Sequence, residues 1–152
     1  MVASLSGPNN NSLNKTSPSG LLKQPSSQHV GVGEDVTLTA IYKGDSPAQV
    51  VTWASRTSAK GDIKASEWKD MPFNTLKFTT SAIIYETTKK TSTSTLIVND
   101  VNKDDEKDYR ARATYATGGD NFYVNTTAVN IIIKCMSSKF VTLTALYLHL
   151  YP

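Results

Sequence analysis

The sequence contains a single cysteine, Cys135, which excludes an intrachain disulfide. Such cysteine usage argues weakly against an oxidising compartment. Histidine is also scarce: His29 and His149 lie in an N-terminal segment and in the C-terminal tail, and no Ser/His/Asp or Cys/His set can be assembled. The sequence has no phosphate-binding glycine loop and no metal-spaced group of ligands. We therefore expect a protein that is not an enzyme and that binds no cofactor.

Charge of one sign is not in large excess either. The 16 Lys and Arg residues against 13 Asp and Glu residues give a net charge of +3, whereas a nucleic-acid-binding protein needs a clustered basic face. We expect no nucleic-acid partner. The length of 152 residues suits one domain with a sizeable core. Long runs with helical periodicity are missing, and the abundant Thr and Ser favour a half-exposed antiparallel sheet.

The N-terminal segment differs from the rest in composition. Residues 1–20 are Asn, Ser, Gly and Pro with almost nothing apolar, so we expect a disordered leader. This leader lacks the basic-then-apolar layout of a signal peptide. The lack of this layout indicates either a cytosolic protein or a piece of a longer one.

Residues 134–152 form an apolar tail whose nature stays open at this point. Its apolar run, residues 140–151, is about half of the roughly 20 residues that a membrane-spanning helix needs. Three interpretations remain: an extra strand, the start of a truncated membrane segment, or translated non-native sequence. We expect membrane attachment only through sequence outside this chain.

Residues 21–133 carry the pattern of a β-sheet. Short runs rich in β-branched and aromatic residues are separated by Gly, Asp, Lys and Ser clusters, and apolar and polar positions alternate. We predict an all-β domain, an antiparallel sandwich with one face of each sheet buried. The residues expected to point inward are Val36, Leu38, Ala40, Tyr42, Val51, Trp53, Leu96, Val98, Val101, Tyr109, Ala111, Ala113, Tyr115, Val129, Ile131 and Ile133.

Taken in order, these segments resemble an immunoglobulin-like domain of variable or intermediate type. The run P-x-x-x-x-V-x-x-G-x-x-V-x-L-x-A at 25–40 is similar to the first two strands of that family, and Trp53 stands where its buried tryptophan is expected. KFTTS at 77–81 is similar to the start of the fourth strand, and L-x-V-x-x-V, beginning at Leu96, to the fifth. The resemblance covers roughly residues 24–133.

The segment D-x-x-x-Y-x-A at 105–111 resembles the tyrosine corner of the same family. The resemblance implies that the hydroxyl of Tyr109 bonds a nearby backbone group, and that Asp105 pairs with Lys77 at the start of the fourth strand. The alternative is a solvated acidic turn in which Tyr109 is simply part of the core. Either role is structural.

Both cysteine positions of the family are alanine here, Ala40 and Ala111. The resemblance therefore implies an immunoglobulin-like β-sandwich without its inter-sheet disulfide. A disulfide closing a loop of about 70 residues would stabilise the fold by roughly 4 kcal/mol on the entropic model. Buried Trp, Leu and Ile side chains contribute about 1.5–3 kcal/mol each, so a core built around Trp53 can form without it.

Five acidic residues cluster near the corner. Their carboxylates could bind calcium through oxygen ligands, but the spacing lacks the glycine-containing loop of a helix-loop-helix calcium site. We favour an ordinary acidic turn and expect no metal. The five residues are Asp100, Asp104, Asp105, Glu106 and Asp108.

Three arginines are expected to share one exposed face. Arg110 and Arg112 alternate with inward residues, and Arg56 follows Trp53 with outward parity. Two interpretations stay open: an ordinary solubilising surface, or a recognition patch whose guanidinium groups grip carboxylates of an acidic partner. The resemblance implies that this sheet face and the loops at one end bind partner proteins.

Two further segments are candidates for contact. The turn ATGGDNFY at 116–123 would either be a plain hairpin, which we favour, or present Phe122 and Tyr123 to a partner from a loop beside the arginines. The stretch 56–71 carries Trp68, which would either belong to a binding hairpin or cover the edge of the sandwich. We favour the edge position for Trp68.

The resemblance predicts a non-catalytic protein-binding module of a cell-surface or secreted adhesion or recognition protein. The partner would be a protein, with a second copy of this chain as one option. Asn125 begins an acceptor triplet for N-glycosylation, as do Asn10 and Asn14, which fits an extracellular domain. The alternative is an intracellular, cytoplasmic structural module of the muscle-filament type. Such modules often lack the cysteine pair and carry mechanical load.

Overall fold

The computed structural model describes residues 20–72, 74–117 and 119–134. The expected leader and apolar tail therefore lie outside the described residues, except that Gly20 begins the first strand and Lys134 follows the last one. The strands are β1 (Gly20–Lys23), β2 (Gln28–Val30), β3 (Val36–Lys43), β4 (Val50–Arg56), β5 (Lys69–Asp70), β6 (Phe78–Thr80), β7 (Ile84–Glu86), β8 (Thr91–Val98), β9 (Asp108–Thr117), β10 (Asp120–Asn125) and β11 (Val129–Ile133), with one 3-10 turn, η1 (Lys103–Asp105).

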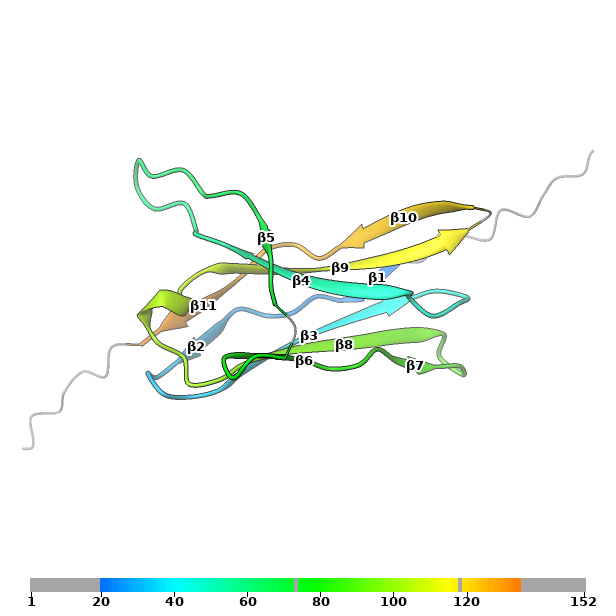
Figure 1. Cartoon of the computed structure of the whole chain (residues 1–152), viewed down its shortest axis with the longest axis horizontal. Coiled ribbons are helices and arrows are strands. Elements are labelled where there is room, and N and C mark those ends of the chain that lie inside the picture. Colours follow the sequence, from blue (N-terminus) through cyan, green and yellow to red (C-terminus); the bar gives the residue numbers. More distant parts are fainter. Residues whose placement is uncertain (1–19, 73, 118, 135–152) are drawn as a thin grey trace, which may run out of the picture.

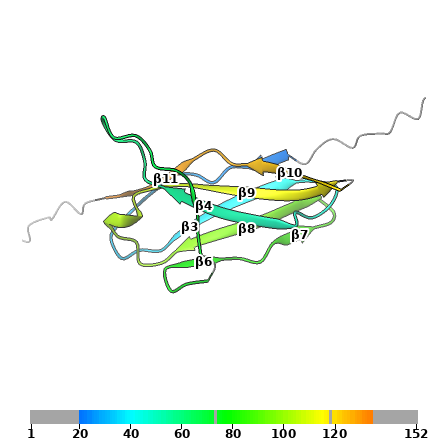
Figure 2. The same ribbon diagram turned by 45° about the horizontal axis from the view of Figure 1, so that its top comes forward.

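The strands form two sheets (Figure 1). The first has the order β1-β3-β8-β6, and β7 also pairs with β8. The second has the order β2-β11-β9-β4-β5, and β10 also pairs with β9. Figure 2 shows the two sheets as separate layers, with β3 and β8 in one and β4 and β9 in the other. The prediction of an all-β, sandwich-like protein is confirmed.

The core lies between these sheets, because the alternation of strand side chains sends every second residue inward. Each residue that the sequence placed inward is buried, and all of them belong to one hydrophobic cluster. The largest fully buried side chains are those of Trp53, Tyr42, Tyr109 and Tyr115. Burial raises the pKa of Tyr42 and of Tyr109 above the usual range, so both phenols stay neutral.

A hydrogen bond between the sheets lies beside the two core alanines. Ala40 of β3 pairs with Ser94 of β8, and Ala111 of β9 pairs with Trp53 of β4. The indole Nε1 of Trp53 donates to Oγ of Ser94 over 3.1 Å, and both side chains are buried. The cross-strand neighbours of the two alanines are thus joined across the core, which satisfies the one polar atom of the tryptophan.

The chain along one side of β9 is interrupted between β10 and β11. β10 and β11 both pair with β9, and residues 126–128 separate them. In the break, Oγ1 of the buried Thr126 accepts a hydrogen bond from the backbone N–H of Ala111, and Thr126 N donates to the carbonyl of Ala111. A side-chain oxygen thus takes the place of a ladder carbonyl, so the backbone of Ala111 stays paired.

Candidate recognition face

The outer face of the second sheet brings together the arginines that the sequence predicted. We call the surface formed by Arg56, Trp68, Arg110, Arg112 and Tyr123 the arginine face. Arg56 ends β4, Arg110 and Arg112 lie on β9, and Tyr123 lies on β10. The two β9 arginines alternate with core residues of the same strand, so both point away from the sandwich interior.

Strand register arranges this face in rows across the sheet. One row aligns Tyr123, Thr114 and Val50, and the next aligns Asn125, Arg112 and Thr52. The third row aligns Arg110, Ala54 and Asp70, and the fourth aligns Asp108 with Arg56. The face therefore runs from an apolar and aromatic end to a charged end.

The ring of Trp68 contacts two of the arginines. Its ring lies 4.6 Å from the Cζ atom of Arg56 and 4.3 Å from that of Arg110, which is the distance at which guanidinium groups attract an aromatic face. The segment 57–68 leaves the sheet after Arg56 and returns at Lys69 of β5 (Figure 1). The end of this excursion brings the indole over the outer surface.

The position favoured for Trp68 from the sequence, on the edge of the sandwich, was therefore wrong. The side chain covers the outer face instead, and Ala54 gives independent support. Ala54 has outward parity, is only 6% exposed, and is not part of the inner hydrophobic cluster. Side chains on the outer face must therefore cover it. The sequence held one sign of this cover: Ala54 is apolar at an outward position, whereas the other exposed strand positions are mostly polar.

The three arginines differ in how their charge is balanced. Arg56 Nε lies 3.0 Å from Oδ2 of Asp108, a side chain that is largely buried. Arg112 Nη2 lies 3.9 Å from Oδ2 of Asp70, a loose pair at the surface. Within the described residues, Arg110 has no carboxylate oxygen within 4.0 Å. Partial burial, and after it the neighbouring cations Arg112 and Arg56, lower the pKa of Arg110, while Asp70 acts in the opposite direction.

The structure places Phe122 and Tyr123 on a strand and not in a loop, which corrects that part of the prediction. Both lie on β10, where neighbouring side chains point to opposite faces. The ring of Phe122 stacks on that of the buried Tyr115, with centroids 5.3 Å apart, and packs against the core. Tyr123 is 58% exposed and lies 5.5 Å from the Cζ atom of Arg112. Only Tyr123 joins the arginine face.

Asn125 lies on the same face as Arg112 and is its cross-strand partner. The residue is exposed. The third residue of its acceptor triplet, Thr127, donates from its hydroxyl to Gln24 Oε1 over 3.1 Å. A glycan attached to Asn125 would therefore lie next to Arg112 of the arginine face.

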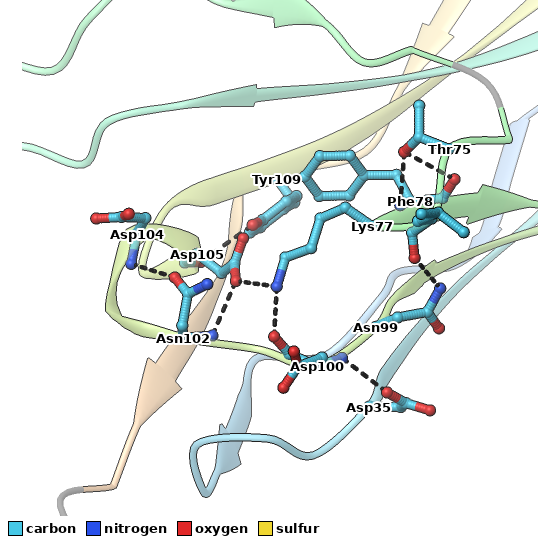
Figure 3. Close-up of polar contacts among 11 residues, drawn as sticks. Asp35, Thr75, Lys77, Phe78, Asn99, Asp100, Asn102, Asp104, Asp105 and Tyr109 are labelled. Atoms are coloured by element: carbon cyan, nitrogen blue, oxygen red, sulfur yellow. Dashed lines mark hydrogen bonds and ion pairs between the residues drawn. The ribbon is translucent and has the colours of Figure 1, made fainter.

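The corner at the start of β9 has the contacts that the resemblance implied (Figure 3). The hydroxyl of Tyr109 donates to the carbonyl of Asp105 over 3.0 Å. Nζ of Lys77 lies 2.7 Å from Oδ2 of Asp105, whose side chain is 5% exposed, and also bonds the carbonyl of Asp100. Asn102 caps η1, and its own N–H donates to Asp105. The corner thus fixes the chain one residue before Arg110.

The acidic cluster of the sequence is divided among separate partners. Asp105 pairs with Lys77, Asp108 with Arg56, and Glu106 with Lys103 over 2.6 Å. The Lys103 hydrogen bond, together with one from the N–H of Ile133, holds the pKa of Glu106 below its usual range. Three or more potential ligands do not converge on a metal-sized site anywhere in the described part of the chain.

One hollow of the described surface lies apart from the arginine face. This open cavity of about 550 Å³ is lined by residues of the 57–63 segment, by η1 and its neighbour Glu106, and by β11. Its charged lining residues are Lys60, Lys103 and Glu106, the last two of which already form an ion pair. None of the residues of the arginine face lines this hollow.

No known family model matches the sequence. No curated protein sequence matches it either. No helix among the described residues is both long and apolar enough to cross a bilayer.

Proposed function

We propose that residues 21–133 form an immunoglobulin-like domain of variable or intermediate type. The order β1-β3-β8-β6 in one sheet and β11-β9-β4 in the other follows the two sheets of that family. β5 beside β4 is in the place of an additional variable-type edge strand. The contacts of Tyr109, Asp105 and Lys77 support the same assignment.

We further propose that the domain is a non-catalytic protein-binding module of a cell-surface or secreted recognition protein. One observation carries this proposal: on the outer side of one sheet, two guanidinium groups lie over the ring of Trp68 and a third lies over the ring of Tyr123. Arg, Trp and Tyr are the residues that dominate binding energy in protein interfaces. Strands carry the three arginines and Tyr123, and stacking orders the side chains, so less conformational entropy is lost when a partner binds.

We expect the double substitution Arg110→Ser and Arg112→Ser to abolish binding without unfolding the domain. Both side chains point outward, and loss of hot-spot residues typically weakens binding by about 30-fold or more. The full chain, displayed as a multimer, would be tested on an array of purified extracellular proteins. Dissociation constants for each captured protein would then be compared between wild type and variant, with circular dichroism to verify folding.

The matched control also removes two positive charges, but from the other sheet, through Lys23→Ser and Lys43→Ser. Both lysines are exposed and lie on β1 and β3. The control should bind as wild type does. Array partners that bind the arginine double variant as tightly as wild type, or the lack of any partner, would contradict the proposal.

Glycosylation of Asn125 should weaken the same interaction. The residue is the cross-strand neighbour of Arg112, so a sugar chain attached there would sterically cover the arginine face. Protein from a secretory expression host should therefore bind less tightly than its Asn125→Gln variant, whereas both should bind equally after enzymatic deglycosylation. Equal affinity of the glycosylated and Asn125→Gln proteins would place the contact surface elsewhere.

A further inference from the structure

We propose that the arginine face binds an extended acidic segment of a different protein through two contacts. One is a carboxylate held by Arg110, and the other is an apolar side chain held between Tyr123 and Val50. The inference rests on the proposed function and specifies the chemistry of the partner. It follows from the charge balance and the register of the face.

Arg110 is the cation of this face that is available to a ligand. Arg56 and Arg112 each have a carboxylate within 4.0 Å, whereas Arg110 has none in the part of the chain that the structure describes. One flat side of its guanidinium is stacked on Trp68. Stacking occupies the flat side of the group and leaves its N–H edge for a planar acceptor, which a carboxylate matches with two parallel hydrogen bonds. The indole also orders the side chain before a ligand arrives, which lowers the entropy lost on binding.

The charge of the face favours one carboxylate over a polyanion. Arg56, Arg110 and Arg112 carry three positive charges, and their partners Asp70 and Asp108 carry two negative ones, which leaves one positive charge. A sulfated polysaccharide would meet the exposed carboxylate of Asp70 as well as the arginines, and the buried carboxylate of Asp108 lies close beneath. A second copy of this chain, docked face to face about a two-fold axis, would bring two faces of the same net positive charge together. Charge complementarity therefore selects an acidic segment from a different protein.

The second contact lies at the opposite end of the face. Tyr123 is 58% exposed and Val50 is 46% exposed, and both align with Thr114 in one row. They flank Thr114, which is on the same strand as Arg110 and four residues beyond it. At about 3.4 Å per residue, the two contacts are roughly 13 Å apart. An extended partner spans this distance with an acidic and an apolar side chain four positions apart.

The test selects ligands without presupposing their identity. A displayed library of random 12-residue peptides would be selected on the full chain and counter-selected on the Arg110→Ser chain. We expect the enriched peptides to share an Asp or Glu four positions from an aromatic or aliphatic residue. A synthetic copy of the best peptide would be measured by calorimetry at several salt concentrations, together with its variant in which the acid is replaced by its amide.

Replacing the peptide acid by its amide should weaken binding about tenfold or more, the size of a charge-assisted hydrogen bond. Arg110→Ser should cause a similar loss and remove most of the salt dependence. Tyr123→Ser should weaken binding but keep the salt dependence, because it removes the apolar contact alone. Lys23→Ser, a lysine on the other sheet, should change neither quantity.

The outcomes separate this inference from the proposed function. Peptides that depend on Arg110 and Arg112 but bind equally well with the amide would overturn the acidic partner and leave the binding face in place. Peptides that bind the Arg110→Ser/Arg112→Ser chain as tightly as wild type would overturn both. A selection without any Arg110-dependent peptide would overturn the inference. So would tighter binding of a heparin hexasaccharide at the same face, or a dimer in sedimentation that Arg110→Ser dissociates.

Discussion

Replacing Ala40 and Ala111 together with cysteine is expected to create a disulfide and to stabilise the oxidised protein by about 4 kcal/mol. The two residues are about 70 positions apart, and on the entropic model the stabilisation grows with the length of the closed loop. For a domain of this size, 1 kcal/mol shifts the melting temperature by a few degrees, so we expect an increase of more than 10 °C. The measurement is thermal unfolding of oxidised and reduced protein, with Cys135 replaced by Ser so that only one pair can form.

The structure supports this expectation through the neighbours of the two alanines. Both are fully buried, and they lie on facing sheets. Their cross-strand partners, Ser94 and Trp53, already touch through a hydrogen bond of 3.1 Å across the core. The two Cβ atoms are thus next to a point where side chains of the two sheets touch, and two small methyl groups leave room for sulfur atoms.

The control moves one cysteine by two residues, as Ala40→Cys with Ala113→Cys. Ala113 is fully buried and on the same face of β9, but it lies about 7 Å farther along the strand. A disulfide tolerates Cα separations of only about 4.4–6.8 Å, so this pair should stay reduced. Free thiols in the Ala40/Ala111 variant under oxidising conditions, or oxidised protein less stable than reduced, would contradict the immunoglobulin-like assignment of these two positions.

The sequence predicts those features that depend on a single strand, and it predicts less well those that depend on how distant segments pack. Inward positions followed from alternation along single strands, and every one of them is buried. The outward direction of Arg56, Arg110 and Arg112 follows from the same rule. Alternation is a property of one strand, so it needs no knowledge of which strands are neighbours.

Trp68 and Phe122 were misplaced because their positions depend on non-local geometry. Trp68 follows an irregular excursion at 57–68, whose path no periodicity determines. Phe122 faces the core because the register aligns Asp120 with Thr117, which puts Phe122 opposite the inward Tyr115. The adjacent glycines of the sequence favour a plain hairpin between these strands, and the pairing of Asp120 with Thr117 agrees with it.

One strand connects the core, the corner and the arginine face. β9 sends Tyr109, Ala111 and Ala113 into the core while it presents Arg110 and Arg112 to solvent. The corner precedes Arg110 directly, so the hydrogen bonds that hold Asp105 and Tyr109 also fix where β9 begins. Loss of the corner contacts should therefore lower the free energy of unfolding. The arginine face should change only if the fold of the domain changes with it.

This dependence makes Lys77→Met the second large prediction. Lys77 is the cation that neutralises the buried carboxylate of Asp105, at 2.7 Å. Removing one partner of a fully buried ion pair leaves an uncompensated charge and typically costs 3–5 kcal/mol, whereas here the carboxylate is buried and the side chain of Lys77 is 29% exposed. The N–H of Asn102 would still donate to that carboxylate, so we expect the lower end, about 3 kcal/mol in the free energy of unfolding. Chemical denaturation measures it directly.

A matched surface substitution and a double-mutant cycle measure the contribution of the Lys77–Asp105 pair. Lys89→Met breaks the pair with Glu86, in which both side chains are exposed, so it should cost less than about 1 kcal/mol. Asp105→Asn in the Lys77→Met background should recover part of the lost stability, because it removes the buried charge that has no partner. If Lys77→Met costs no more than Lys89→Met, or if the two corner substitutions simply add, the buried pair is not what anchors the corner, and the hydrogen bond from Tyr109 to the carbonyl of Asp105 must hold the start of β9 alone.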